Sequence, residues 1–130
     1  MKIVLGYDGS DAAKEALKQA RSQAKAFDGK VYVVASVVGG AARQTHEIEQ
    51  SRADLTYAEK YLKEKGVVHE PHLLVRGLPP GEDLVQFARE KKADRVIIGV
   101  KRKSTVGKLV FGSTAQYVIL EAHCPVLTVK

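Results

Sequence analysis

Several features are scarce in this sequence of 130 residues, and each scarcity narrows what the protein can be. There is one cysteine, Cys124, so a disulfide within the chain is excluded. Aromatic residues make up only 6% of the sequence, which is few for a surface that stacks nucleic-acid bases. No apolar run approaches the roughly 18 residues of a membrane-spanning helix, and Asp8 interrupts the first apolar stretch before a signal peptide could form. We therefore expect a cytoplasmic protein with no membrane partner.

Acidic residues are also in the minority, because 15 Asp and Glu face 21 Lys and Arg and give a formal net charge of +6. The excess is local, since Lys101, Arg102, Lys103 and Lys108 fall in one loop with no acid among them. Charge that is so localised does not track a nucleic-acid backbone, and no nucleic-acid-binding motif is present. Nonspecific nucleic-acid binding is therefore the least favoured function.

The apolar pattern alternates between strands and helices along one domain, residues 1–130. Short β-branched runs predict strands at 2–7, 31–38, 67–75, 95–100 and 125–129. Helical periodicity predicts helices at 11–27, with Phe27 on the inward face, at 45–65, at 80–92 and from 113 onward. This βαβαβαβαβ order predicts an α/β fold with an open, parallel, five-stranded sheet and helices on both faces.

The same pattern predicts where the strands lie in the sheet. The first and fourth strands should be neighbours at its centre, where the connections change direction and open a crevice for ligands. Pro71 lacks an N–H group, so the strand that contains it should lie at an edge. The last strand, Pro125 to Val129, should be the other edge. Because its backbone groups are unpaired there, we expect oligomerisation in which a partner strand covers this edge.

The loop from Gly99 to Ser113 is the most informative segment for function. It follows a buried strand, carries the four clustered cations and leads into a helix whose N-terminus attracts anions. A solvated basic connector is the simpler interpretation, but the position at a strand's carboxyl end favours phosphate binding. A P-loop is excluded, because the nearest window, Arg102 to Leu109, lacks the first glycine and the final hydroxyl.

The loop after the first strand, Tyr7-Asp8-Gly9-Ser10, lies across the same crevice. Asp8 has two interpretations. It could bind a sugar hydroxyl or a phosphate-borne metal, or it could simply form the turn and the helix cap. The cations on the facing loop favour contact with a ligand.

Four motifs together resemble the universal stress protein family over essentially the whole chain. They are Tyr7-Asp8-Gly9-Ser10, Arg76-Gly77-x-Pro79, Gly112-Ser113 at the end of the basic loop, and the terminal His123-Cys124-Pro125-Val126-Leu127. The resemblance implies a Rossmann-like fold of the adenine nucleotide alpha hydrolase type, and a homodimer that pairs the terminal strand, Pro125 to Val129, across a two-fold axis. It also implies an ATP site with Asp8 at the ribose or a metal, and with the backbone of Ala35, Ser36 and Val37 at the adenine. Gly99, Gly112, Ser113 and Thr114 would lie at the ribose and phosphates. Tyr7, Gly9, Lys101, Arg102 and Lys103 adjoin these positions and complete the predicted site.

One departure from the family pattern bears on binding, because Arg102 replaces the second glycine of its G-x2-G motif. A side chain there costs on the order of 1 kcal/mol if the backbone needs a positive φ, and it could obstruct the phosphates. Alternatively, the guanidinium could grip a phosphate with two hydrogen bonds. The neighbouring lysines favour the second outcome. A smaller departure is Ala115, where the family often has a hydroxyl.

The leading hypothesis is a nucleotide-dependent stress-response regulator that binds ATP, ADP or AMP, with or without Mg²⁺. The alternative is a nucleotide-free dimeric interaction module in which Arg102 has displaced the phosphate-loop glycine. No catalytic residue is assigned, because no G-x-S-x-G elbow occurs, so any ATP hydrolysis should be slow. No metal site of the protein's own is assigned either, since His69 and His72 point to opposite faces of a strand.

Overall fold

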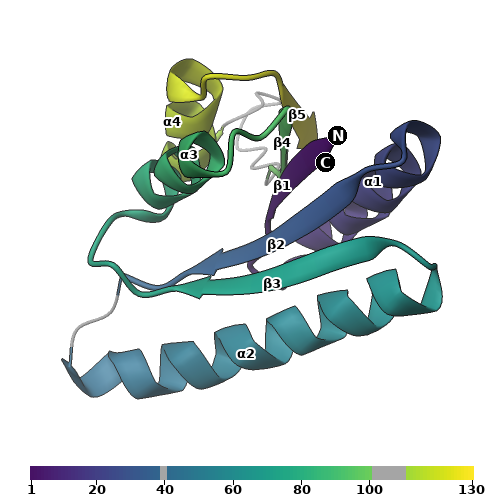
Figure 1. Ribbon diagram of the computed structural model, residues 1–130. Coiled ribbons are helices and arrows are strands. Elements are labelled where there is room, and N and C mark those ends of the chain that lie inside the picture. Colours follow the sequence, from purple (N-terminus) through teal and green to yellow (C-terminus); the bar gives the residue numbers. More distant parts are fainter. Residues whose placement is uncertain (39–40, 101–110) are drawn as a thin grey trace, which may run out of the picture.

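The backbone alternates strands and helices, as the sequence predicts (Figure 1). The computed structural model describes residues 1–38, 41–100 and 111–130. In these ranges the elements follow in the order β1 (Lys2–Gly6), α1 (Asp11–Phe27), β2 (Lys30–Ser36), α2 (Ala41–Glu64), β3 (Val68–Leu74), α3 (Pro80–Glu90), β4 (Arg95–Gly99), α4 (Ser113–Glu121) and β5 (Val126–Val129).

The strands form one parallel sheet of order β3-β2-β1-β4-β5. β1 lies at the centre, where Val4 is opposite Tyr32 of β2 on one side and Val96 of β4 on the other. From β1 the chain first builds outward through β2 and β3, then returns to add β4 and β5 on the opposite side. The predicted pairing of the first and fourth strands is confirmed, and it defines the switch point where open α/β sheets bind ligands.

Helices cover both faces of the sheet, as predicted. Figure 1 shows α1 and α2 on one face, with α3 and α4 on the other. Successive residues of a strand face opposite sides, so Ile3 and Leu5 of β1 enter the core under α1 and α2, while Val4 enters the core under α3 and α4. All three side chains are fully buried. This double coverage explains why the central strands are almost continuously apolar.

Helix α1 begins and ends where its capping residues predict. The Ser10 hydroxyl accepts a hydrogen bond from the Ala13 N–H at 3.1 Å, and Asp28 adopts the left-handed conformation that ends the helix. The predicted inward position of Phe27 is wrong, because 54% of this residue is exposed. Phe27 is the last residue of the helix, beyond the turns that pack on the sheet, and its ring instead lies against the Arg95 guanidinium at 5.7 Å.

Helix α2 begins at Ala41 rather than near Thr45. Its first turn carries no acidic residue to mark the start, whereas alanine is the strongest helix former and extends the helix without any other signal. Leu55 and Leu62 of α2 are buried in the core that α1 and α2 form with the sheet.

Both edges of the sheet are the strands that the sequence predicts. β3 contains the exposed Pro71, and β5 lies at the opposite edge with four partly exposed residues. In the described ranges, no helix combines the length and the hydropathy needed to cross a membrane.

Candidate binding site at the carboxyl edge of the sheet

A cavity opens where β1, β2 and β4 end, in the crevice predicted at the switch point. Its volume is about 720 Å³, which is within the range of small-molecule sites. The strand ends form its floor, and the first half of α2 and the starts of α3 and α4 form its walls. Among the described residues the lining consists of Gly6, Tyr7, Asp8, Ala13, Val34, Ala35, Ser36, Val37, Val38, His46, Glu47, Gln50, Ser51, Asp54, Pro80, Leu84, Ile98, Gly99, Val100, Gly112, Ser113, Thr114 and Ala115.

Most of the residues predicted for the site line this one cavity. They come from four separate segments of the chain: Tyr7 and Asp8; Ala35, Ser36 and Val37; Gly99; and Gly112, Ser113 and Thr114. Gly9 belongs to the same loop as Asp8 but is not part of the lining. Lys101, Arg102 and Lys103 lie outside the described residues.

Asp8 forms the local turn and also faces the cavity. Its Oδ1 accepts a hydrogen bond from the Ser10 N–H at 3.0 Å, which is the turn-forming contact that aspartate commonly makes. The side chain remains exposed, with Oδ2 outside that hydrogen bond. The two interpretations of Asp8 are therefore compatible, because one carboxylate can serve both the turn and a ligand.

Tyr7 is part of the cavity lining, but its hydroxyl is buried. The residue is 3% exposed, and its buried hydroxyl has no hydrogen-bond partner among the described residues. Burial raises the pKa of this phenol, and the nearby Tyr57, Asp54 and Asp8 raise it further. The phenol therefore stays neutral at physiological pH and is not exposed to a ligand.

Gly9 lets the first loop approach α2. Its φ of +77° lies in the region that favours glycine, and a Cβ atom there would come within 2.5 Å of Asp54 Oδ1. The same Asp54 oxygen accepts a hydrogen bond from Gln50 Nε2 at 3.1 Å. Gly9 is thus needed for the fit between the loop and the helix, and its place beside the cavity follows from that fit.

One wall of the cavity was not predicted from the sequence. It consists of polar residues spaced three or four apart on the first half of α2, which places them on one helical face: His46, Glu47, Gln50, Ser51 and Asp54. This spacing could have indicated a polar face on the helix. The apolar residues of the helix, however, indicate only the half that packs on the sheet.

The opposite wall is apolar. Leu84 of α3 lies so close to the end of β1 that a Cβ atom at Gly6 would be 2.8 Å from its Cδ1. Val34 and Ile98 face the same side of the sheet and belong with Leu84 to the core under α3 and α4. This end of the cavity suits a flat, largely apolar group.

Helix α4 points its N-terminus at the cavity. Gly112 is the N-cap, and no described side chain caps the first turn, so Ser113 and Thr114 belong to a turn whose N–H groups lack helical partners. Among the described residues, a Cβ atom at Gly112 would meet nothing within 4 Å. The first turn of α4 therefore offers donors and a positive dipole end to an anion, as the loop pattern predicts.

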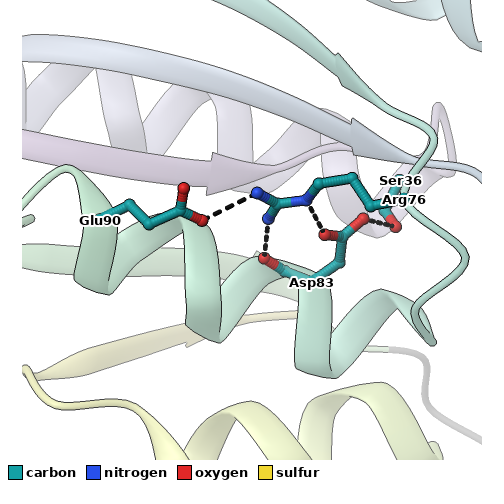
Figure 2. Close-up of polar contacts among 4 residues, drawn as sticks. All are labelled: Ser36, Arg76, Asp83 and Glu90. Carbon is teal, nitrogen blue, oxygen red and sulfur yellow. Dashed lines mark hydrogen bonds and ion pairs between the residues drawn. The ribbon is translucent and has the colours of Figure 1, made fainter.

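Asp83 is another residue that the sequence did not predict. It is fully buried, accepts a hydrogen bond from Ser36 Oγ at 2.7 Å, and accepts another from Arg76 Nε at 2.6 Å (Figure 2). Ser36 and Asp83 are separated by 47 positions, so no local pattern joins them. The family motif that contains Arg76 predicts only a turn and not this contact with Asp83.

The remaining candidates for chemistry lie away from the cavity. Cys124 is partly buried, and burial, with a contribution from the charge of Asp94, raises the pKa of its thiol. The reactive thiolate is therefore scarce at neutral pH. His72 Nε2 lies 2.6 Å from Glu70 Oε1, so this ring nitrogen is paired with a carboxylate. In the described part of the chain no three His, Cys, Asp or Glu side chains are grouped as a metal site requires.

Known proteins share both the sequence and the fold of this chain. The model of the universal stress protein family matches residues 1–130. A universal stress protein of Methanocaldococcus jannaschii is 39% identical over 140 residues, covering 99% of this chain and 81% of the relative. One of Thermus aquaticus is 37% identical over 134 residues, covering 98% of this chain and 97% of the relative.

Solved structures agree. The universal stress protein from Archaeoglobus fulgidus has a TM-score of 0.92 and 40% identity, covering 100% of this chain and 98% of that one. A structure from Archaeoglobus fulgidus in complex with dAMP has a TM-score of 0.86, 37% identity and the same coverage. A universal stress protein in complex with cAMP has a TM-score of 0.79 and 28% identity, covering 99% and 95%. This chain belongs to the universal stress protein family.

Proposed function

We propose that the protein binds an adenine nucleotide in the cavity at the carboxyl edge of the sheet. One observation carries the proposal: a single cavity of about 720 Å³ combines an apolar wall, an exposed carboxylate and an uncapped helix N-terminus. These surroundings suit a base, a ribose and a phosphate respectively. Relatives with 37% and 28% identity that were solved with dAMP and cAMP support the same ligand class.

The described residues divide among the parts of the nucleotide. Leu84 and the end of β2 would hold the base, and Asp8 Oδ2 would accept a hydrogen bond from a ribose hydroxyl. The hydroxyls and N–H groups of Ser113 and Thr114 would bind the phosphates. We expect Lys101, Arg102 and Lys103, which lie outside the described residues, to add charge there. ATP, ADP and AMP share all three parts, and Asp8 could also hold a Mg²⁺ ion carried by the phosphates.

We propose regulation rather than turnover as the purpose of binding. Within the described part of the lining, no serine is hydrogen-bonded to a histidine, the pairing that activates a serine nucleophile. Phosphoryl transfer also requires an oriented attacking group, and any hydrolysis would be slow without one. Bound nucleotide would instead alter how this one domain meets its partners, including a second copy across β5.

A calorimetric titration tests the proposal. Nucleotide-stripped protein is titrated with Mg-ATP and with AMP at physiological salt, and GTP is the comparison ligand. We expect saturable binding of the adenine nucleotides at about one site per chain. If millimolar ATP gives neither heat nor thermal stabilisation, the proposal is wrong and the nucleotide-free dimeric module takes its place.

Substitution of Gly112 tests the location of the site. Because Gly112 lines the cavity and its Cβ position has no described atom within 4 Å, Gly112→Val should fill the place of the phosphates and remove ATP binding. The variant should keep its fold, as measured by thermal unfolding. Undiminished affinity for ATP in a folded Gly112→Val protein would show that the nucleotide binds elsewhere.

A further inference from the structure

The hydroxyl of Ser36 is committed to a buried partner. Ser36 ends β2, lines the cavity and donates from Oγ to Asp83 Oδ2 at 2.7 Å (Figure 2). A serine hydroxyl has one proton and two lone pairs. Once the proton is given to Asp83, Oγ can only accept a hydrogen bond from anything in the cavity.

Asp83 cannot donate a hydrogen bond to Ser36 instead, because its own partners keep it an acceptor. It is fully buried in the first turns of α3. Arg76 Nε donates to its Oδ1 at 2.6 Å, and Arg76 Nη2 donates to its backbone carbonyl at 3.2 Å. A carboxylate paired in this way with a guanidinium accepts hydrogen bonds and donates none. The proton between Ser36 and Asp83 therefore has to come from Ser36.

The apolar surroundings of Ser36 make it important for ligand binding whether its hydroxyl donates or accepts a hydrogen bond. Val34 faces the same side of β2, and Leu84 and Pro80 of α3 line the cavity beside it. In an apolar setting, a ligand atom gives up its hydrogen bonds to water and is not compensated if the protein group that it meets cannot pair with it. An acceptor at Ser36 can therefore discriminate between bases.

We propose that Ser36, oriented by Asp83, makes the cavity selective for a 6-aminopurine over a 6-oxopurine. The exocyclic amine of adenine donates a hydrogen bond to Ser36 Oγ, whereas O6 of a 6-oxopurine would set a lone pair against a lone pair. Asp83 is a positioning residue, because it acts only by directing the Ser36 proton. This inference rests on the proposed nucleotide site and adds the group that reads the base.

Three nucleoside monophosphates with different groups at purine position 6 provide the test. AMP carries an amine, purine riboside 5′-monophosphate carries hydrogen, and IMP carries oxygen together with a proton on N1. For the unsubstituted protein we expect AMP to bind roughly three- to tenfold more tightly than the hydrogen analogue, the usual value of one hydrogen bond, and IMP to bind most weakly.

Substitutions at Ser36 assign the discrimination to this side chain. Ser36→Ala should bind AMP and the hydrogen analogue equally, while Ser36→Thr should restore the preference because it keeps the hydroxyl. Ser22→Ala, an exposed serine on α1, is the matched control and should change neither affinity. Asp83→Asn can donate to Ser36 Oγ and release the serine proton toward the cavity, so it should narrow the gap between AMP and IMP.

The outcomes separate the two proposals. If the unsubstituted protein binds neither AMP nor ATP, the nucleotide site itself is wrong and base selection falls with it. If it binds AMP but does not distinguish the hydrogen analogue, or if folded Ser36→Ala keeps the full preference, the site stands and the role of Ser36 is overturned. An unchanged gap between AMP and IMP in folded Asp83→Asn overturns the positioning role of Asp83.

Discussion

At Gly99 the end of β4 meets helix α1 so closely that no side chain fits between them. A Cβ atom there would lie 2.5 Å from the Ala12 carbonyl carbon and 2.6 Å from the Ala13 nitrogen. Both are backbone atoms within a helix, so neither can move aside as a side chain would. The family resemblance assigns Gly99 to ligand binding, but its geometry shows that it is also required for packing.

Alanine at Gly99 should therefore destabilise the fold. We expect Gly99→Ala to lower the free energy of unfolding by roughly 3 kcal/mol, at the upper end for an overpacked site. Gly112→Ala is the matched control, since its Cβ would meet no atom of the described residues within 4 Å, and replacing this N-cap glycine should cost only about 0.5 kcal/mol. Urea denaturation measures both. Equal, small losses would mean that α1 can shift away from β4.

At the residue scale, the sequence predicted those cavity-lining residues whose signals are local. Asp8, Gly112 and Ser113 stand in short motifs beside a strand end or a helix start, and such motifs can be read without knowing the fold. Asp83 carries no such signal, because its role depends on Ser36 and Arg76 meeting in space. The hydroxyl of Tyr7 was equally unpredictable, because the sequence does not show that α2 covers it.

At the scale of elements, one arginine ties both ends of helix α3 to the segment that precedes it. Arg76 lies in the segment between β3 and α3 and bonds both ends of the helix, Asp83 near its start and Glu90 at its end (Figure 2). Partial burial alone would lower the pKa of Arg76, but the hydrogen bonds to Glu90 and Asp83 raise it overall. Arg76 therefore stays charged and holds the wall of the cavity that carries Leu84.

Removing this charge should be costly because Asp83 is buried. Arg76→Met leaves a carboxylate without its cation, and we expect a loss of roughly 3 kcal/mol or more in the free energy of unfolding. Glu90→Gln breaks only the exposed half of the arrangement and should cost less than about 1 kcal/mol. Thermal and urea unfolding of the two variants give the comparison. Similar losses in both would show that Asp83 does not depend on Arg76.

The elements themselves were predictable to different degrees. Ser10 and Asp28 bracket α1, so both of its ends were predicted correctly. The start of α2 had no cap to mark it and was placed too late. Phe27 shows the limit of periodicity: it continues the inward pattern, but the pattern does not reveal where the sheet beneath the helix ends.

At the scale of the whole molecule, β5 leaves half of its backbone groups facing outward. The Val96 and Val100 N–H groups donate to the carbonyls of Pro125 and Val129. Backbone groups alternate in direction along a strand, so residues 125, 127 and 129 face β4, and Val126 and Thr128 face away. This outward row is what a second copy would pair with in the homodimer that we propose.

Proline at Thr128 tests the dimer without breaking the sheet. The Thr128 N–H faces away from β4, so Thr128→Pro removes no hydrogen bond within the chain but blocks strand pairing across the edge. We expect the unsubstituted protein and Thr128→Val to be dimers by light scattering at tens of micromolar, and Thr128→Pro to be a monomer. A dimeric proline variant would place the interface elsewhere, and a monomeric unsubstituted protein would refute the dimer.

The architecture of the whole molecule was the most predictable level. Nearly continuous apolar strands separated by amphipathic helices permit few arrangements, because parallel strands require crossovers of one hand. Pro71 and the short terminal strand then indicated which two strands lie at the edges of the sheet. The cavity's location followed from that topology, whereas its polar wall did not, since α2 is much longer than the sheet needs and its first half serves the cavity instead.

The ends of both edge strands are hydrogen-bonded to residues that line the cavity. The Val37 N–H donates to the Leu74 carbonyl of β3 at 2.8 Å, and the Val100 N–H donates to the Val129 carbonyl of β5 at 2.7 Å. Each edge strand is thus bonded directly to a residue of the cavity lining, with no other strand between them. Fraying of an edge would expose one of these two amides to exchange with solvent deuterium. The exchange rates of Val37 and Val100 thus report, separately for each side, how firmly the cavity floor is held.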